Sequence, residues 1–193
     1  MLFRSGNGVL DTDQLSEASQ AVVNAEQAKT AVDTKLSDIT ADGLVTPDET
    51  AEVDTLIQTL ESAKQTAQEK VNSVPNGTTG KGELQTRLDN IASVTSPEVN
   101  DADSNGVLDT DQLSEASQAV ANAEQAKTVV DTKLSDITAD GLVTPDEKSE
   151  VDALIQALES AKQTAQEKIN NVPASTEGKD ELQPRLDNIA SVT

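Results

Sequence analysis

The chain has 193 residues, with 35 acidic and 14 basic side chains and a net charge of −21. It lacks cysteine and histidine, which excludes zinc sites, disulfides, thiol nucleophiles and imidazole bases. The negative charge disfavours binding to nucleic acid and to anionic lipid surfaces, and no apolar stretch is long enough for membrane insertion.

Two copies of one unit account for nearly the whole sequence. Residues 8–95 align without gaps on residues 106–193, and 75 of the 88 aligned pairs are identical. Such a repeat indicates one structural unit used twice. We place the domains at residues 1–97 and 98–193, with the linker around Pro97.

Each copy begins with a predicted long helix, which in the second copy extends to about Ile137. No glycine or proline interrupts it, and its apolar residues recur every three or four positions, as on one face of an α-helix. This face consists of Leu113, Ala116, Val120, Ala123, Ala126, Val130, Leu134 and Ile137. Asp109 and Gln112 fit a capping box at its start, and Asp111 is placed in its first turn.

The second helix of each copy has clear start and stop signals. Thr144 and Glu147 fit a capping box with Pro145 at the first helical position, and Pro173 ends the helix just after Asn171. Its apolar face consists of Val151, Leu154, Leu158, Ala161, Ala165, Ile169 and Val172.

A third, shorter helix begins near Asp180. A start at Thr176 would place Pro184 deep in the helix, at a cost of about 3 kcal/mol. Its apolar face consists of Leu182, Leu186, Ile189 and Val192. The predicted fold is all-α, with two tandem three-helix bundles that form an elongated rod. The long helices, of about 26 residues each, span about 40 Å.

One pair of loops matches a twelve-residue EF-hand loop at several positions. Asp136–Glu147 and Asp38–Glu49 each carry Asp at position 1, Asp at 5, Gly at 6 and Glu at 12. The calcium candidates are Asp136, Asp140 and Glu147 in the second copy, and Asp38, Asp42 and Glu49 in the first. The alternative is metal-free: Asp140 and Gly141 form a left-handed helix C-cap, and Thr144 starts the next helix. We favour capping alone and keep calcium as the alternative.

A second type of loop precedes the first helix of the second copy. Its candidate ligands for calcium are Asp101, Asp103, Asn105 and Asp109, but it ends in Gln112, which lacks the carboxylate of the usual Glu. In the first copy, Phe3 and Ser5 stand where Asp101 and Asp103 would be, so this N-terminal loop is partly replaced. A calcium ion bound at Asp101–Asp109 would stiffen the joint between the bundles.

The remaining acidic residues, such as Glu115, Glu124, Glu159 and Glu167, are interpreted as solvated helix faces. Catalysis by a carboxylate pair needs a cleft that holds the two groups at a fixed separation. A thin bundle without tryptophan or tyrosine offers no such cleft and no platform on which a sugar could stack. We therefore expect no enzymatic activity.

The order of these segments resembles the GA-like helical domains that occur in tandem in large bacterial surface adhesins. The most specific segments are GLVTPDE at 141–147 and LQPRLDNI at 182–189, and the resemblance covers nearly the whole chain. It implies an extracellular, helical repeat region on the bacterial cell surface that acts as a stalk or spacer for adhesive domains.

Two functions follow as expectations. The leading one is a structural spacer, a monomer whose partners are the neighbouring repeats of its own chain. The alternative is a binding module in which each bundle captures a host protein such as albumin. Binding hot spots favour Trp, Tyr and Arg, and the chain has no Trp or Tyr, which favours the spacer. Weak self-association bridged by calcium is a third interpretation.

Overall fold

The computed structural model describes residues 10–139 and 141–192, which form six α-helices and no β-strand. The chain divides into two compact units, Met1–Val99 and Asn100–Thr193. Each unit contains three helices that pack on one another. The all-α class and the pair of three-helix bundles predicted from the sequence are therefore confirmed.

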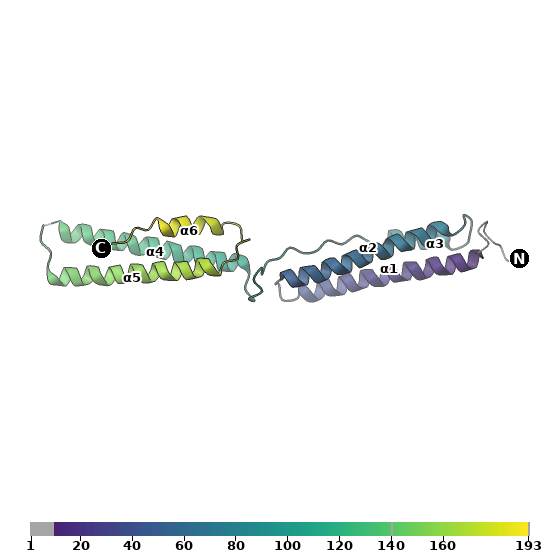
Figure 1. Ribbon diagram of the computed structural model, residues 1–193, viewed down its shortest axis with the longest axis horizontal. Coiled ribbons are helices and arrows are strands. Elements are labelled where there is room, and N and C mark those ends of the chain that lie inside the picture. Colours follow the sequence, from purple (N-terminus) through teal and green to yellow (C-terminus); the bar gives the residue numbers. More distant parts are fainter. Residues whose placement is uncertain (1–9, 140, 193) are drawn as a thin grey trace. The chain divides into compact units, whose positions relative to one another are not determined.

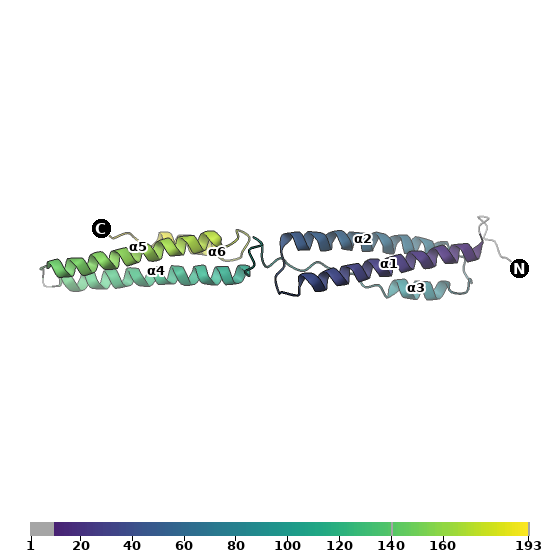
Figure 2. The ribbon, with the colours of Figure 1, turned by 90° about the horizontal axis from the view of Figure 1, so that it is seen from below.

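Unit 1 consists of two long antiparallel helices and one short helix (Figure 1). The long helices are α1 (Asp11–Ile39) and α2 (Pro47–Ser73), and the short one is α3 (Lys81–Asp89). The chain that follows α3 runs back along the long helices in an extended conformation (Figures 1 and 2).

Unit 2 repeats this arrangement with α4 (Asp109–Thr138), α5 (Pro145–Asn171) and α6 (Lys179–Asp187). The end of α5 before Pro173 is as predicted, and α6 begins one residue before the predicted Asp180. The nine-residue α6 ends before the predicted apolar positions Ile189 and Val192, because its last turn tightens and the Ile189 N–H donates to the Leu186 carbonyl at 3.1 Å.

The core of each unit follows the predicted helical faces. In unit 2 the buried residues of this core are Ala116, Ala119, Val120, Ala123, Val130, Leu158, Ala165, Ile169, Val172, Leu182, Leu186 and Ile189. All of these except Ala119 were predicted, and the core of unit 1 is built from the equivalent positions. The small alanine side chains in the seam let the long helices pack closely.

Large apolar side chains are exposed at few places among the described residues. These are Val99, Val107, Val129, Leu142 and Val143. None of the helices in the described ranges is long and apolar enough to cross a membrane. The apolar residues of both units are thus used mainly to hold the three helices together.

Candidate functional site

The loop that precedes α4 is organised around the carboxylate of Asp101, which is only 1% exposed. One oxygen accepts a hydrogen bond from the Asn105 N–H at 3.0 Å, and the other accepts from the Gly106 N–H at 2.9 Å. Gly106 has a φ of +83°, a left-handed conformation in which glycine avoids the steric cost of a Cβ. Asp101 therefore closes the loop on itself.

Asp109 is the first residue of α4, and its carboxylate turns back toward the loop. It accepts from the Ala102 N–H at 3.0 and 3.3 Å. The predicted capping box of Asp109 and Gln112 is therefore wrong: the N-cap position is occupied by Leu108, and no side chain caps this helix. Asp109 lies one position beyond the N-cap, and its carboxylate accepts from the backbone of Ala102.

Asp103 and Gln112 connect the loop to the bundle. The Gln112 side-chain amide donates to the Asp103 carboxylate at 3.3 Å and to the Asn171 carbonyl, at the end of α5, at 3.2 Å. The Asn105 side-chain amide donates to the same oxygen of Asp103 at 3.0 Å, while its own oxygen accepts from the Val107 N–H at 2.9 Å. The loop is thus tied to both long helices of unit 2.

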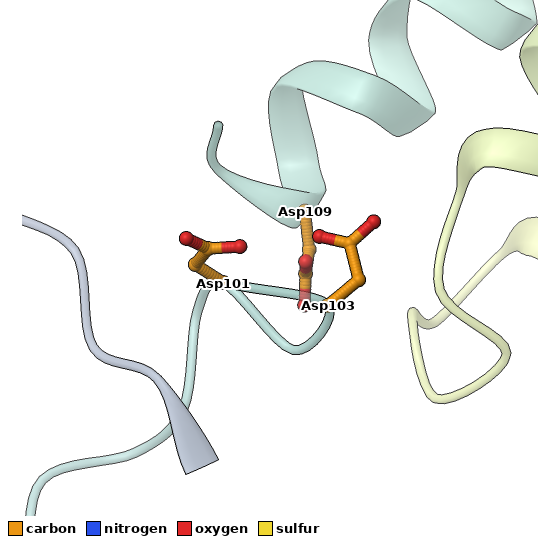
Figure 3. Close-up of side chains that lie close together, drawn as sticks. All are labelled: Asp101, Asp103 and Asp109. Atoms are coloured by element: carbon orange, nitrogen blue, oxygen red, sulfur yellow. The ribbon is translucent and has the colours of Figure 1, made fainter. Parts of the chain in front are cut away.

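These contacts bring three of the four candidate residues together (Figure 3). One carboxylate oxygen from each of Asp101, Asp103 and Asp109 lies within 4.8 Å of the other two. Asp101 and Asp109 are buried and Asp103 is exposed. Two unit charges at this separation repel by roughly 1 to 4 kcal/mol, depending on the local dielectric. The described residues contain no other such group, and oxygen ligands of this kind suit a hard cation such as calcium.

The α1–α2 loop does not gather its three candidate ligands in this way. Asp42 accepts from the Leu44 N–H at 3.0 Å, and Glu49 accepts from the N–H and the hydroxyl of Thr46, each at 2.9 Å. The Thr46 hydroxyl also accepts from the Glu49 N–H, which completes a capping box. Asp38, on the last turn of α1, belongs to no such cluster among the described residues.

The α4–α5 loop contains the same capping box. Glu147 accepts from the N–H and the hydroxyl of Thr144, each at 2.8 Å, and these bonds lower the pKa of the Glu147 carboxyl. Pro145 occupies the first helical position, as predicted. Asp136 lies exposed on the last turn of α4, and Asp140 lies outside the described residues. The predicted capping box is confirmed in both units.

Ion pairs between helices were missed by the sequence reasoning. Arg185 of α6 donates to both oxygens of Glu124 on α4, at 3.1 and 2.9 Å, and Arg87 binds Glu26 in the same way at 2.9 and 2.6 Å. Hydrogen bonds to the glutamates raise the pKa of both arginines, and the bond from Arg87 lowers the pKa of Glu26. Glu124 is therefore not simply solvated, as the sequence suggested.

Lysines make further pairs that recur in both units. Lys168 contacts Glu115 at 2.6 Å, and Lys70 contacts Glu17 at 2.7 Å. Each of these pairs joins residues 53 apart, and each arginine pair joins residues 61 apart, in both units. The sequence offered no signal for these pairs, because two near-identical copies keep the separation of almost every pair of charges. Such pairs orient helices but contribute little individually, about 0.2 to 1 kcal/mol when exposed.

Comparison with known proteins identifies a family. The family model of the GA-like domain matches residues 15–110 and 113–193, which together are most of the chain. No curated protein and no solved structure matches. The first matched segment includes α2, α3 and the loop with the three aspartates, and the second includes most of α4 together with α5 and α6. The chain therefore belongs to the GA-like domain family.

Proposed function

We propose that the chain is a spacer of a bacterial cell-surface adhesin, located outside the cell, in which tandem bundles project adhesive domains from the surface. The observation that carries this proposal is that each unit buries its apolar residues within its own three helices. A module with its own core can be added or removed without rebuilding its neighbours. The absence of cysteine is compatible with an extracellular bacterial location.

The surface chemistry supports a structural role without catalysis. Both arginines among the described residues, Arg87 and Arg185, are engaged in ion pairs within their own unit. A hollow of about 640 Å³ lies between α5 and α6 in unit 2 and is lined mainly by polar side chains. Its Lys162 donates to the Ile189 carbonyl at 3.1 Å, a contact that holds the chain after α6 in place.

Small-angle X-ray scattering of the whole chain tests the spacer. Helices of 27 to 30 residues are about 40 to 45 Å long, so two bundles arranged end to end give a maximum dimension of about 80 Å or more. A concentration series tests whether a large maximum dimension comes from dimers. A maximum dimension near 50 Å would contradict the proposal, because the bundles would then lie side by side.

The alternative is capture of a host protein such as albumin, which membership of the GA-like family leaves open. A pull-down from serum distinguishes the two functions. Retention of one specific partner at micromolar affinity would favour the binding module. If no partner is retained and the scattering shows an extended chain, the spacer is favoured.

We also propose that the loop before α4 binds calcium. Asp101, Asp103 and Asp109 supply three carboxylates within 4.8 Å of one another. The hydrogen bonds that Asp101 accepts use one lone pair on each oxygen, so a second lone pair remains on each for a cation. A divalent cation would also offset the mutual repulsion of the three charges.

Calorimetric titration with calcium tests this site. We expect one calcium ion to bind per chain and the melting temperature of unit 2 to rise. Asp103→Asn should weaken binding, because it removes the exposed carboxylate while keeping the shape of the side chain. Asp42→Asn, in the α1–α2 loop, is the matched control and should have no effect. Absence of both heat and a thermal shift at millimolar calcium would overturn the proposal.

A further inference from the structure

Two loops with the same sequence differ in exposure. Asp38–Glu49 and Asp136–Glu147 are identical residue for residue. Yet the Val45 residue is 5% exposed, whereas its counterpart Val143 is 57% exposed. The adjacent Leu142 is 69% exposed. Since the sequences are the same, the cause lies in the surroundings of each loop.

In unit 1 the chain after α3 passes along α2 toward the α1–α2 loop (Figures 1 and 2). Val94 packs on the core, and the Ser96 hydroxyl donates to the carboxylate of Asp54 in α2. Ser96 and Pro97 are half-buried. The segment therefore lies against α2, whereas a free linker would be exposed throughout.

The chain after Ser96 is long enough to reach the α1–α2 loop. Asp54 is eight residues beyond the N-cap Thr46, which corresponds to about 12 Å along the helix. The three residues after Ser96, which end at Val99, cover about 10 Å when extended, and Pro97 favours an extended chain because its φ is fixed. An extended chain after Ser96 is therefore long enough to bring Val99, which is 37% exposed, to the region of Val45.

In unit 2 the described chain ends at Val192, the counterpart of Val94, so no described residue corresponds to Ser96–Val99. We propose that Ser96–Val99 is a fourth element of the bundle, and that the exposed Leu142–Val143 surface of unit 2 docks a segment of the same Ser-Pro-Glu-Val sequence placed after Thr193. This occupant is favoured over a second copy of the chain, because the equivalent segment already lies along unit 1 and a net charge of −21 opposes association of two copies.

One difference between the units affects the docking. In unit 2, Asp152 takes the place of Asp54, and Lys148 donates to it at 2.8 and 3.0 Å. Unit 1 has Thr50 in place of Lys148. The incoming serine hydroxyl would share the Asp152 carboxylate with this lysine, so Lys148→Thr makes the two surfaces equivalent.

The test extends the whole chain by Ser-Pro-Glu-Val-Asn after Thr193, with Ser-Gly-Glu-Gly-Asn as the matched control. Nuclear magnetic resonance with a soluble paramagnetic probe reports the accessibility of the Val143 methyl groups, and Val45 is the internal reference. We expect the accessibility of Val143 to fall toward that of Val45 with the first extension and to stay high with the control.

Two further variants keep the result decisive. Val99→Gly in unit 1 should raise the accessibility of Val45, and the extended Lys148→Thr chain should protect Val143 at least as well as the extended native chain. The proposal is overturned if the extension leaves Val143 unchanged in both chains, or if Val99→Gly leaves Val45 unchanged. It is also overturned if sedimentation shows a dimer of the native chain that Val143→Asp dissociates, because a second copy would then be the occupant.

Discussion

The loop before α4 and the loop between α4 and α5 contain related sequences but use their acidic residues differently. Both turn at a left-handed glycine, Gly106 with a φ of +83° and Gly141 with a φ of +75°. In the first loop, the carboxylates of Asp101 and Asp109 accept hydrogen bonds from backbone N–H groups of the loop. In the second loop, Glu147 instead joins the capping box at the start of α5.

The difference depends on which residue occupies the N-cap position. Thr144 is extended and offers a hydroxyl, so it caps α5 and recruits Glu147. Leu108 has no polar side chain, so α4 lacks a side-chain cap, which would be worth about 1 kcal/mol. The first loop thus lacks a side-chain cap, and its aspartates hold the loop backbone in place.

The largest expected effect comes from Asp101→Ala. It leaves the N–H groups of Asn105 and Gly106 without their acceptor, at about 1 to 3 kcal/mol for each group that stays buried. We expect unit 2 to lose about 2 kcal/mol, measured from amide exchange of the core residues of α4. Asp103→Ala is the control, because that residue is exposed and accepts only from side chains. Equal effects of the two substitutions would show that Asp101 does not organise the loop.

Substitution of the two glycines should affect both loops alike. Gly106→Ala and Gly141→Ala each force a side chain into the left-handed region, which costs about 1 to 2 kcal/mol. No heavy atom lies within 4 Å of the added Cβ at either position, so backbone strain is the only cost. Asparagine should cost less than alanine, since it tolerates this conformation. Thermal unfolding of the alanine and asparagine variants at both positions measures the loss of stability. A loss at only one of the two positions would contradict the left-handed conformation that both glycines share.

Removal of the N-cap hydroxyl should affect only the α1–α2 and α4–α5 loops, which carry the capping boxes. Thr144→Ala and Thr46→Ala each remove a hydroxyl that accepts from the N–H of the N3 glutamate, and we expect a loss of about 1 kcal/mol in either unit. Urea unfolding measures the loss. Thr132→Ala, in the middle of α4, is the control and should not destabilise, because alanine has the higher helix propensity. A similar loss with the control would mean that capping is not the cause.

The sequence predicted those features that depend on residues close together in the chain. The apolar period placed Val120 and Leu158 in the core, and the three-residue spacing of Thr144 and Glu147 predicted the start of α5. Both follow from the geometry of a single helix. The same local reasoning was wrong for Asp109, because its carboxylate had a competing donor in the N–H of Ala102 seven residues earlier.

Features that depend on tertiary structure could not be predicted from the local sequence pattern. Glu124 meets Arg185 only after α6 has packed on α4, so its partner does not follow from its own helix. Val45 and Val143 have identical neighbours in sequence and different exposure, so the sequence of the loop cannot determine their burial. The convergence of Asp101, Asp103 and Asp109 was suggested by spacing, but the hydrogen bonds that hold them come from loop geometry.

The smallest effect concerns the pH dependence of the cap. Hydrogen bonds from the Thr144 N–H and hydroxyl lower the pKa of Glu147 from its ordinary value of 4.5. Because the pKa is lower in the folded than in the unfolded chain, this contribution is complete above the ordinary value and is lost as the pH falls through the folded value. Carbon-detected titration of the Glu147 carboxyl should give a midpoint below 4.5, and Thr144→Ala should raise it.

The stability difference between the native chain and Thr144→Ala should be constant near neutral pH and shrink in acid. A midpoint that Thr144→Ala leaves unchanged would show that the hydroxyl does not bind the charged carboxylate preferentially, and that the lowered pKa comes from the backbone N–H of residue 144, which alanine keeps.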